Sequence, residues 1–261
     1  GPTVTPEKVK GALKELGFAD VIEVAIGADL CTVEEAEDFL SKVPAEQPFM
    51  ATSCCPAWSV MAKKLFPDFK PYISMALTPM VLTGRLIKKQ KPDAKVVFIG
   101  PCAAKKLEAS RKSVRSDVDF VLTFEEVMGM FEAKGINLPQ VEADAPFEEG
   151  TANGRGFAVS GGVANAVKQC IQKEHPYKEV LIDSAEGLKN CRTMLMMAKA
   201  GKRNGYLLEG MACPGGCVAG AGTLQPVIKS SALVKKYTND AEKKLAFESE
   251  YLDNLDLLTK E

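Results

Sequence analysis

The sequence is poor in histidine, and this shortage restricts the chemistry that the protein can perform. Its 261 residues include one histidine, His175, which lies in a polar stretch before a proline and is expected in an exposed turn. Zinc sites with two histidine ligands are therefore excluded, and catalytic triads with a histidine base are disfavoured. Any proton chemistry has to use cysteine, carboxylate, serine or lysine side chains.

Net charge and long apolar runs are also lacking. The formal net charge is −1, with 46% hydrophobic and 26% charged residues, as in an ordinary soluble globular protein. Such a balance favours neither nucleic acid nor an anionic membrane as partner. No apolar run approaches the ~20 residues of a membrane-spanning helix, and no secretory signal is recognisable. We therefore expect a cytoplasmic protein of one large domain or two small ones.

Cysteine, by contrast, is abundant, and the chain contains eight. Disulfide frameworks are typical of small secreted domains, so metal binding or catalysis is the better interpretation of these residues. Cys31, Cys170 and Cys191 are isolated from the others, and we expect all three to be structural packing residues.

Short apolar strands alternate with helical segments along the chain. A capping-box pattern at Thr32–Glu35 predicts the start of one helix, and residues 241–258 have helical periodicity. Residues 136–156 form a linker-like stretch. The alternation predicts an α/β fold with mostly parallel sheets covered by helices. The strands are predicted near residues 20–26, 48–53, 94–99, 119–122, 180–183 and 206–211.

Three of the predicted strands run into loops that contain four of the cysteines. Cys55, Cys102 and the pair Cys213 and Cys217 each follow one such strand. In an open α/β fold the carboxyl ends of the strands converge where ligands bind. Four thiolates that meet there suit a [4Fe–4S] cluster.

The residues around these cysteines favour a metal site. Pro-Gly-Gly separates Cys213 from Cys217, and glycines let the backbone approach a bulky ligand. Lys105 and Lys106 follow Cys102, and nearby cations favour the thiolate form that binds metal. Each segment alone also has a simpler interpretation: a glycine turn with two incidental thiols, or a small buried cysteine.

The same three segments resemble the signature segments of [FeFe]-hydrogenases. They read Thr52-Ser-Cys-Cys-Pro-x-Trp58, Pro101-Cys-x-x-Lys-Lys106 and Glu209-x-Met-Ala-Cys-Pro-Gly-Gly-Cys217, and the likeness extends from about Thr5 to about Pro226. The resemblance implies that residues 1–261 form a catalytic H-cluster domain. Its expected architecture is two lobes, each a small, mostly parallel twisted sheet flanked by helices, with the cluster in the cleft between them.

The resemblance also implies a cofactor and its ligands. The H-cluster is a [4Fe–4S] cubane joined through one cysteine sulfur, here that of Cys217, to a two-iron unit with CO, cyanide and azadithiolate ligands. Lys105 is expected to donate a hydrogen bond to an iron-bound cyanide. Met211, Gly100 and Pro101 are expected beside the two-iron unit. The motif positions assign the cubane to Cys55, Cys102, Cys213 and Cys217.

A proton route follows from the same resemblance. Cys54 is the spare thiol beside a cluster ligand, and the route continues through Glu35 and Ser74 to Asp38, which stands where glutamate is usual. A thiol can carry the proton, since its unperturbed pKa is about 8.5. On helix patterns alone, Glu35 is also interpreted as the last member of the capping box and Asp38 as a solvated surface residue.

Two features depart from the commoner pattern of the family. Gly100 takes the place of a methionine, which is expected to enlarge the pocket and to remove a thioether contact. The third segment ends in Gly220-Ala-Gly-Thr223 and not in the commoner run of glycines. Both features resemble a less studied subgroup that has Gly-Pro-Cys in its second segment.

The function that the resemblance implies is reversible reduction of protons to H₂, in an anaerobic hydrogen metabolism. Electrons are expected from ferredoxin or from fused ferredoxin-like domains. The chain has no ferredoxin-like cysteine runs, so we expect a catalytic piece of a longer protein. The two-iron unit requires maturation proteins, and an unmatured chain would be inactive.

Three alternative functions stay open. They are a hydrogen sensor with slow turnover, an iron–sulfur assembly protein of the same superfamily, and a plain [4Fe–4S] electron carrier. Cys54 argues against the first two, whose members tend to lack that thiol, whereas Gly100 mildly favours the sensor. An electron carrier would leave Cys54 and Lys105 without a role.

Overall fold

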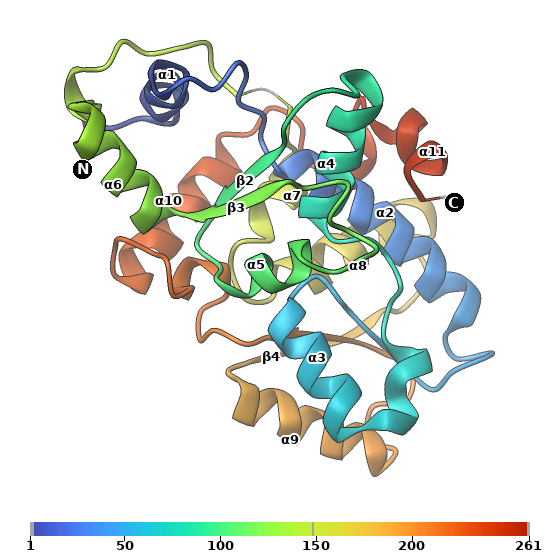
Figure 1. Cartoon of the computed structure of the whole chain (residues 1–261). Helices are drawn as coiled ribbons and strands as arrows, with labels where there is room; N and C mark the ends of the chain where they lie inside the picture. The colour runs from blue at the N-terminus through green and yellow to red at the C-terminus, as the bar shows by residue number, and fades with distance from the viewer. Residues whose placement is uncertain (1–2, 148, 260–261) are drawn as a thin grey trace.

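The strands of the protein form two separate parallel sheets. The computed structural model describes residues 3–147 and 149–259. One sheet has the order β1-β5-β4, the other pairs β2 with β3, and these pairings are all parallel (Figure 1). The predicted α/β class is therefore confirmed. The strands are β1 (Met50–Ala51), β2 (Val97–Gly100), β3 (Phe120–Thr123), β4 (Leu181–Glu186) and β5 (Tyr206–Met211).

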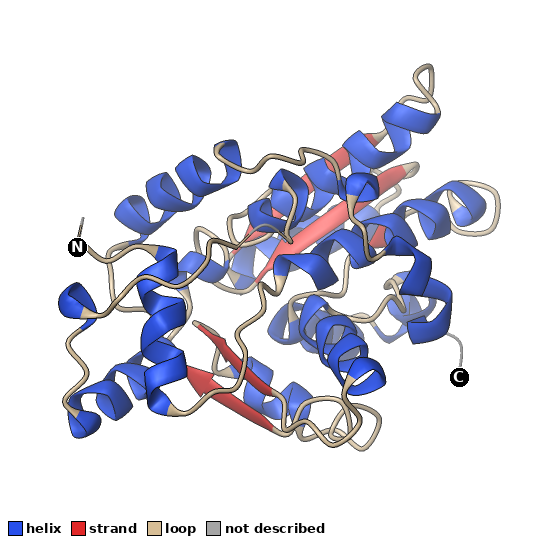
Figure 2. Ribbon diagram, turned by 90° about the horizontal axis from the view of Figure 1, so that it is seen from above, coloured by secondary structure: helices blue, strands red, loops and turns tan. Residues whose placement is uncertain are grey.

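Helices surround both sheets (Figure 2). Helices α8 and α9 pack against β4 and β5, α3 packs against β5 and α9, and α6 packs against α1, β2 and β3. The α-helices are α1 (Pro6–Leu16), α2 (Ala25–Lys42), α3 (Pro56–Leu65), α4 (Pro79–Gln90), α5 (Ala104–Ala109), α6 (Phe124–Lys134), α7 (Ala152–Gly156), α8 (Gly162–Glu174), α9 (Leu188–Lys199), α10 (Val227–Asn239) and α11 (Leu255–Thr259). Short 3₁₀ helices span Pro67–Tyr72, Leu138–Gln140, Cys217–Ala219, Ala246–Glu248 and Leu252–Asn254.

The core of the larger sheet fixes the start of α3. Trp58 is fully buried, and its indole N–H donates to the Thr52 carbonyl at 3.0 Å. The ring lies against the backbone of β5, because a Cβ atom on Gly210 would meet it at 2.1 Å. Only glycine permits this approach. The contact holds the β1–α3 loop, with Cys54 and Cys55, close to the carboxyl end of β5.

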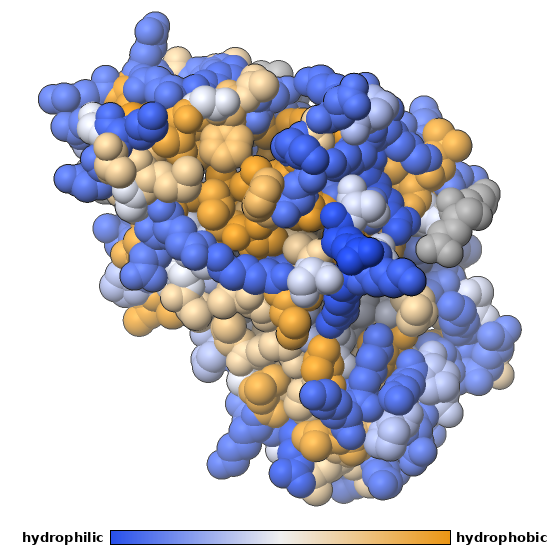
Figure 3. All heavy atoms as spheres, viewed as in Figure 1, coloured by the Kyte–Doolittle hydropathy of each residue, from blue (hydrophilic) through white to orange (hydrophobic). Residues whose placement is uncertain are grey.

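The two-stranded sheet is more thinly covered. Val97, Phe98 and Ile99 of β2 are half-buried, and Phe120 of β3 is 61% exposed. Figure 3 shows apolar side chains gathered over this part of the molecule, below α1 in that view.

Helix α2 is longer than the sequence predicts. The predicted strand at residues 20–26 is wrong, since the helix already begins at Ala25. Thr32 does not cap a helix: it lies inside α2 and its hydroxyl donates to the Ala28 carbonyl at 2.8 Å. The helix packs against α4, α7 and α8. Apolar residues therefore occur around the whole helix and not only along one face. Glu35 consequently lies in the middle of a buried helix.

The C-terminal part differs from the prediction as well. Residues 241–258 hold two 3₁₀ turns and four of the five residues of α11, whereas the longer helix, α10, comes before them. Arg85 anchors this end, because its guanidinium donates to the Leu258 carbonyl at 2.8 Å. Over the described ranges, no helix combines the length and the apolar character that a membrane crossing requires.

Candidate metal centre

The three cysteine loops all leave the carboxyl ends of strands. Cys54 and Cys55 lie between β1 and α3, and Cys55 is the N-cap of α3. Cys102 follows β2, while Cys213 and Cys217 follow β5. Since β1 and β5 are parallel neighbours, the first and third loops emerge side by side. The second loop comes from the other sheet.

Hydrogen bonds tie the second loop to the third. The Gly222 amide donates to the Pro101 carbonyl at 2.9 Å, directly beside Cys102. The segment that precedes α8 holds the Cys217 loop in turn, because the Ser160 amide donates to the Gly215 carbonyl at 3.2 Å. These contacts bring Cys102 and Cys217 to the same region.

The four thiols lie within electrostatic range of one another. Burial raises the pKa of Cys217 to about 12, and the charges of Cys55, Cys102 and Cys213 contribute to this rise. Burial, Cys55 and Cys102 likewise raise the pKa of Cys213. Thiols gathered in this way need a positive centre to stabilise their charged form, and a bound metal supplies it.

The donor set and the backbone fit a cluster better than a single ion. No three His, Cys, Asp or Glu side chains of the described ranges converge as the ligands of one metal ion do. A cubane spreads four thiolates over separate irons, so their sulfurs stand farther apart than around one ion. Gly216 has φ +93°, and a Cβ there would meet the Ser160 nitrogen at 2.6 Å. The loop therefore packs in a shape that favours glycine. The residues present thus fit an iron–sulfur cluster.

The side chains of Lys105 and Lys106 reach different partners. Lys105 is 9% exposed; its ammonium donates to the Cys54 carbonyl at 3.3 Å and to the Glu108 carboxylate at 2.6 Å. Its charge also acts to lower the pKa of Cys217, against the larger effect of burial. Lys106 pairs with Glu126 at 2.8 Å at the protein surface. Of the two lysines, Lys105 therefore contacts a cysteine loop, whereas Lys106 is engaged at the surface.

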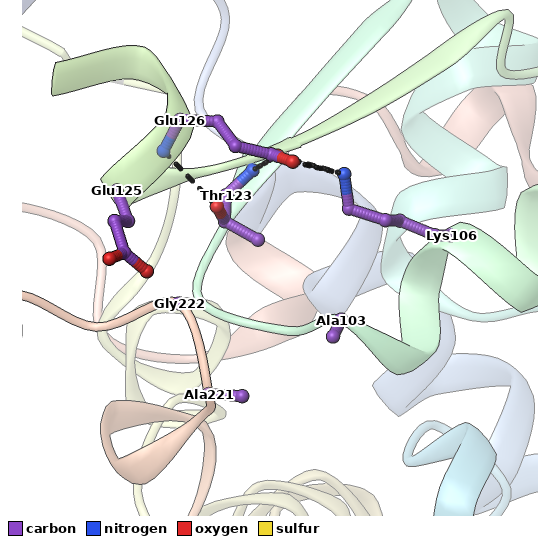
Figure 4. A pocket seen from close by; sticks show the side chains of 7 residues that line it. All are labelled: Ala103, Lys106, Thr123, Glu125, Glu126, Ala221 and Gly222. Carbon is purple, nitrogen blue, oxygen red and sulfur yellow. Dashed lines mark hydrogen bonds and ion pairs between the residues drawn. The ribbon is translucent and has the colours of Figure 1, made fainter. Parts of the chain in front are cut away.

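An open hollow of about 330 Å³ lies outside the second and third loops (Figure 4). The Lys106 ammonium reaches across its rim to Glu126, while Ala103 and Ala221 line its floor. Cysteine is missing from its described lining, so the hollow is distinct from the thiol cluster. Its lining residues are Ala103, Lys106, Thr123, Glu125, Glu126, Ala221 and Gly222.

Gly100 and Met211 are both buried next to the cysteine loops. The expected enlargement of the pocket at Gly100 is not found: a Cβ there would meet the Phe98 ring at 2.8 Å, so this ring occupies the adjacent space. Met211 ends β5 and belongs to the same apolar cluster as Cys54 and Ile26.

The residues of the predicted proton route come from three segments: Glu35 and Asp38 from α2, Cys54 from the β1–α3 loop, and Ser74 from the loop before α4. Glu35 is fully buried, and burial raises its pKa to about 8. Ser74 and the Ser53 amide lie near enough to lower that pKa, yet neither carboxyl oxygen has a partner with hydrogen-bond geometry in the described part of the chain. Burial, with the charge of Glu35, also raises the pKa of Cys54 well above its usual value. Asp38 is half-buried and pairs with Lys42 at 2.9 Å.

Several residues of this region were missed by sequence reasoning. Cys31 is fully buried on α2 and feels the charges of Glu35 and Cys54. The i, i+4 spacing of Cys31 and Glu35 was the available signal. Burial raises the pKa of Glu34 to about 7, and the charge of Asp38 adds to this. Glu209 is buried and accepts backbone N–H bonds at the start of α8.

Comparison with known proteins is consistent with this geometry. A periplasmic [Fe] hydrogenase large subunit of Nitratidesulfovibrio vulgaris is 31% identical over 270 residues, which cover 87% of this chain and 64% of that protein. Iron hydrogenase 1 of Clostridium pasteurianum is 30% identical; the match covers 87% of this chain and 47% of that protein. A cytosolic Fe-S cluster assembly factor of Danio rerio is 28% identical, and the match covers 87% of this chain and 68% of that protein. The chain thus spans about half to two thirds of these relatives.

Solved structures share the fold. A [FeFe]-hydrogenase from Chlamydomonas reinhardtii aligns with a TM-score of 0.75 over 97% of this chain and 83% of that chain, at 21% identity. Residues 1–221 match the family described as "Iron only hydrogenase large subunit, C-terminal domain". The chain therefore belongs to the family formed by the C-terminal domains of iron-only hydrogenase large subunits.

Proposed function

We propose that this chain is the catalytic domain of an iron-only hydrogenase that reversibly reduces protons to H₂ with electrons from a ferredoxin. The observation that carries the proposal is the group of four thiols, delivered by two different sheets, next to a fifth buried thiol and a fully buried carboxyl. A protein that only carries electrons needs the first four and has no use for the other two.

Four cysteine side chains would hold the cubane of the H-cluster, which, with its two-iron unit, supplies the electrons and the metal at which hydrogen forms. Lys105 would present its ammonium group to an anionic ligand of that unit, and Met211 would exclude water from its apolar side. The cubane ligands would be Cys55, Cys102, Cys213 and Cys217.

Glu35 would act as the buried proton carrier of the route. With a pKa of about 8 it holds its proton at neutral pH. It can therefore give that proton to Cys54 and then take up another proton from the surface. Ser74 lies beside its carboxyl group, and Asp38 with Lys42 would form the outer end of the route. The proton rests on a carboxyl oxygen of Glu35 and then on the sulfur of Cys54.

Basic residues at the carboxyl-terminal end of α3 suit an acidic electron donor. Burial lowers the pKa of Lys63 on α3, and the neighbouring charges of Arg111 and Lys70 lower it further. α3 begins directly after Cys55, so Lys63, in the last turn of this helix, shares an element with one candidate ligand. Charge complementarity of this kind speeds association. A cytoplasmic ferredoxin would fit it.

An assembly function is the second candidate, because relatives of similar identity are cytosolic iron–sulfur assembly factors. Such a function would require a cubane and no two-iron unit. The buried Cys54 and Glu35 favour the hydrogenase, since both have a role only where protons are consumed or released.

The test is anaerobic reconstitution, first with iron and sulfide and then with a two-iron unit. We expect infrared bands of iron-bound CO and cyanide, together with H₂ from reduced viologen. Cys54→Ala should keep the cubane and lose nearly all turnover, while Cys213→Ala should lose iron. Cys170→Ala, in the core between α8 and α2, is the matched control and should change neither. A cubane without CO and cyanide bands would refute the hydrogenase and support the assembly function.

A further inference from the structure

A buried glutamate holds the lysine that faces the thiols. Glu108 lies one helical turn after Lys105 on α5 and is 3% exposed. One carboxylate oxygen accepts from the Lys105 ammonium at 2.6 Å, and the other accepts from the Thr78 hydroxyl at 2.7 Å. Both oxygens of Glu108 are thus engaged, which fixes the carboxylate plane and, through it, the lysine.

Thr78 contributes to this arrangement at the expense of its own helix. It is the N-cap of α4, where a threonine oxygen usually accepts a backbone N–H bond, and here its side chain makes no such bond. The hydroxyl points to Glu108 from a residue 30 positions earlier in the chain. The Thr78 hydroxyl is therefore committed to the carboxylate of Glu108 and not to the start of α4.

The ammonium group of Lys105 has one N–H left over. It carries three donors, and within the described ranges two are used, by Glu108 and by the Cys54 carbonyl. The fixed partners restrict the third donor to one direction. Because Cys54, whose carbonyl accepts one of these bonds, directly precedes Cys55, this end of the side chain lies beside the first cysteine loop.

We infer that Glu108, braced by Thr78, is a positioning residue that aims the Lys105 ammonium at an anionic ligand of the metal centre. The inference rests on the proposed function for the identity of that ligand, and on geometry alone for the positioning. Through the Cys54 carbonyl the same lysine also ties the first cysteine loop to α5, so Glu108 aligns two of the three loops.

The first experiment uses the metal-free protein. Wild type, Glu108→Gln, Glu108→Ala and Thr78→Val are treated briefly with an acetylating reagent, and acetylation of Lys105 relative to the exposed Lys112 is measured by mass spectrometry. Because a hydrogen bond between charged groups shifts an opening equilibrium about tenfold or more, we expect the ratio to rise about tenfold in both Glu108 variants and less in Thr78→Val. Glu126→Gln, which unpairs the neighbouring Lys106, is the matched control and should leave Lys105 protected.

An unchanged ratio in the folded Glu108 variants would overturn the inference. Circular dichroism checks their folding, and Thr78→Val, which keeps the charge pair, decides the question where they do not fold. The second experiment loads each protein with the two-iron unit: the infrared cyanide bands should shift or split in Glu108→Gln and not in Glu126→Gln. Unshifted bands would overturn the role towards the ligand. If wild type itself shows no cyanide bands, the proposed function fails, while the acetylation ratio still decides the positioning.

Discussion

Replacing Glu35 with glutamine should change how folding stability depends on pH. The Glu35 side chain is fully buried, and within the described residues neither of its oxygens has a hydrogen-bond partner. Burial therefore penalises the charged carboxylate and raises the pKa from 4.5 to about 8. In the unfolded chain the group returns to its ordinary pKa, so the folded state binds one proton more than the unfolded state between these two values.

The sign and the size follow from this difference. Stability falls as pH rises through the window from 4.5 to about 8, because the folded protein must either keep a proton that the solvent withdraws or bury a charge. The slope is about 1.4 kcal/mol per pH unit. From pH 6 to pH 9 the wild type should therefore lose about 3 kcal/mol that the glutamine variant keeps.

Urea unfolding of the metal-free, reduced protein at pH 6 and at pH 9 measures this effect. Glutamine resembles the protonated carboxyl in shape, so the two proteins should differ little at pH 6 and diverge at pH 9, where the variant is the more stable. Glu37→Gln, on the exposed face of the same helix, controls for loss of surface charge. Parallel stability curves for wild type and Glu35→Gln would show that water reaches the carboxyl, and they would remove the basis for a neutral proton carrier.

Three further variants test other parts of the structure. Asp29→Asn should gain about 3 kcal/mol over wild type between pH 5 and pH 8 in the same unfolding experiment, because burial raises the pKa of Asp29 to about 7; an equal pH dependence would contradict this. Gly210→Ala should lower the unfolding free energy by about 1–3 kcal/mol and shift the Trp58 fluorescence, since the new methyl group overlaps the ring; an unchanged spectrum would disprove the contact. Gly216→Ala should bind less iron on reconstitution with an unchanged far-ultraviolet circular dichroism spectrum, because φ +93° and the Ser160 nitrogen leave no room for a side chain; full iron content would show that the loop adapts.

The sequence predicted best what depends on local pattern. β5 coincides with its predicted range of 206–211. The cysteine loops were located correctly at the strand ends, because a turn after a buried apolar run has few other interpretations. The fold class followed from the alternation of these elements.

Features that depend on distant contacts were not predictable. β-branched residues lie before and within the first turn of α2, and they locally favour a strand. Packing of α2 against α4, α7 and α8 overrides this preference. Lys105 and Lys106 are the same residue type, so the sequence alone could not tell which of them lies beside the thiols. Their different partners follow from the position of α5 in the folded chain. The i, i+3 spacing of Lys105 and Glu108 was a local signal for their ion pair. The contact of Glu108 with Thr78 had no such signal, because Thr78 lies 30 positions earlier, at the start of another helix.

One consequence of the strand arrangement concerns mechanical coupling. Three of the four candidate ligands follow strands of the larger sheet, and Cys102 alone follows the smaller one. An inorganic centre held by all four would link two parts of the molecule that are otherwise joined by loops, by side-chain packing and by the backbone bond from Gly222 to Pro101. Binding of this centre would then restrict motion between the two sheets. Cys102 would be the ligand most exposed to that motion, because it alone follows the smaller sheet.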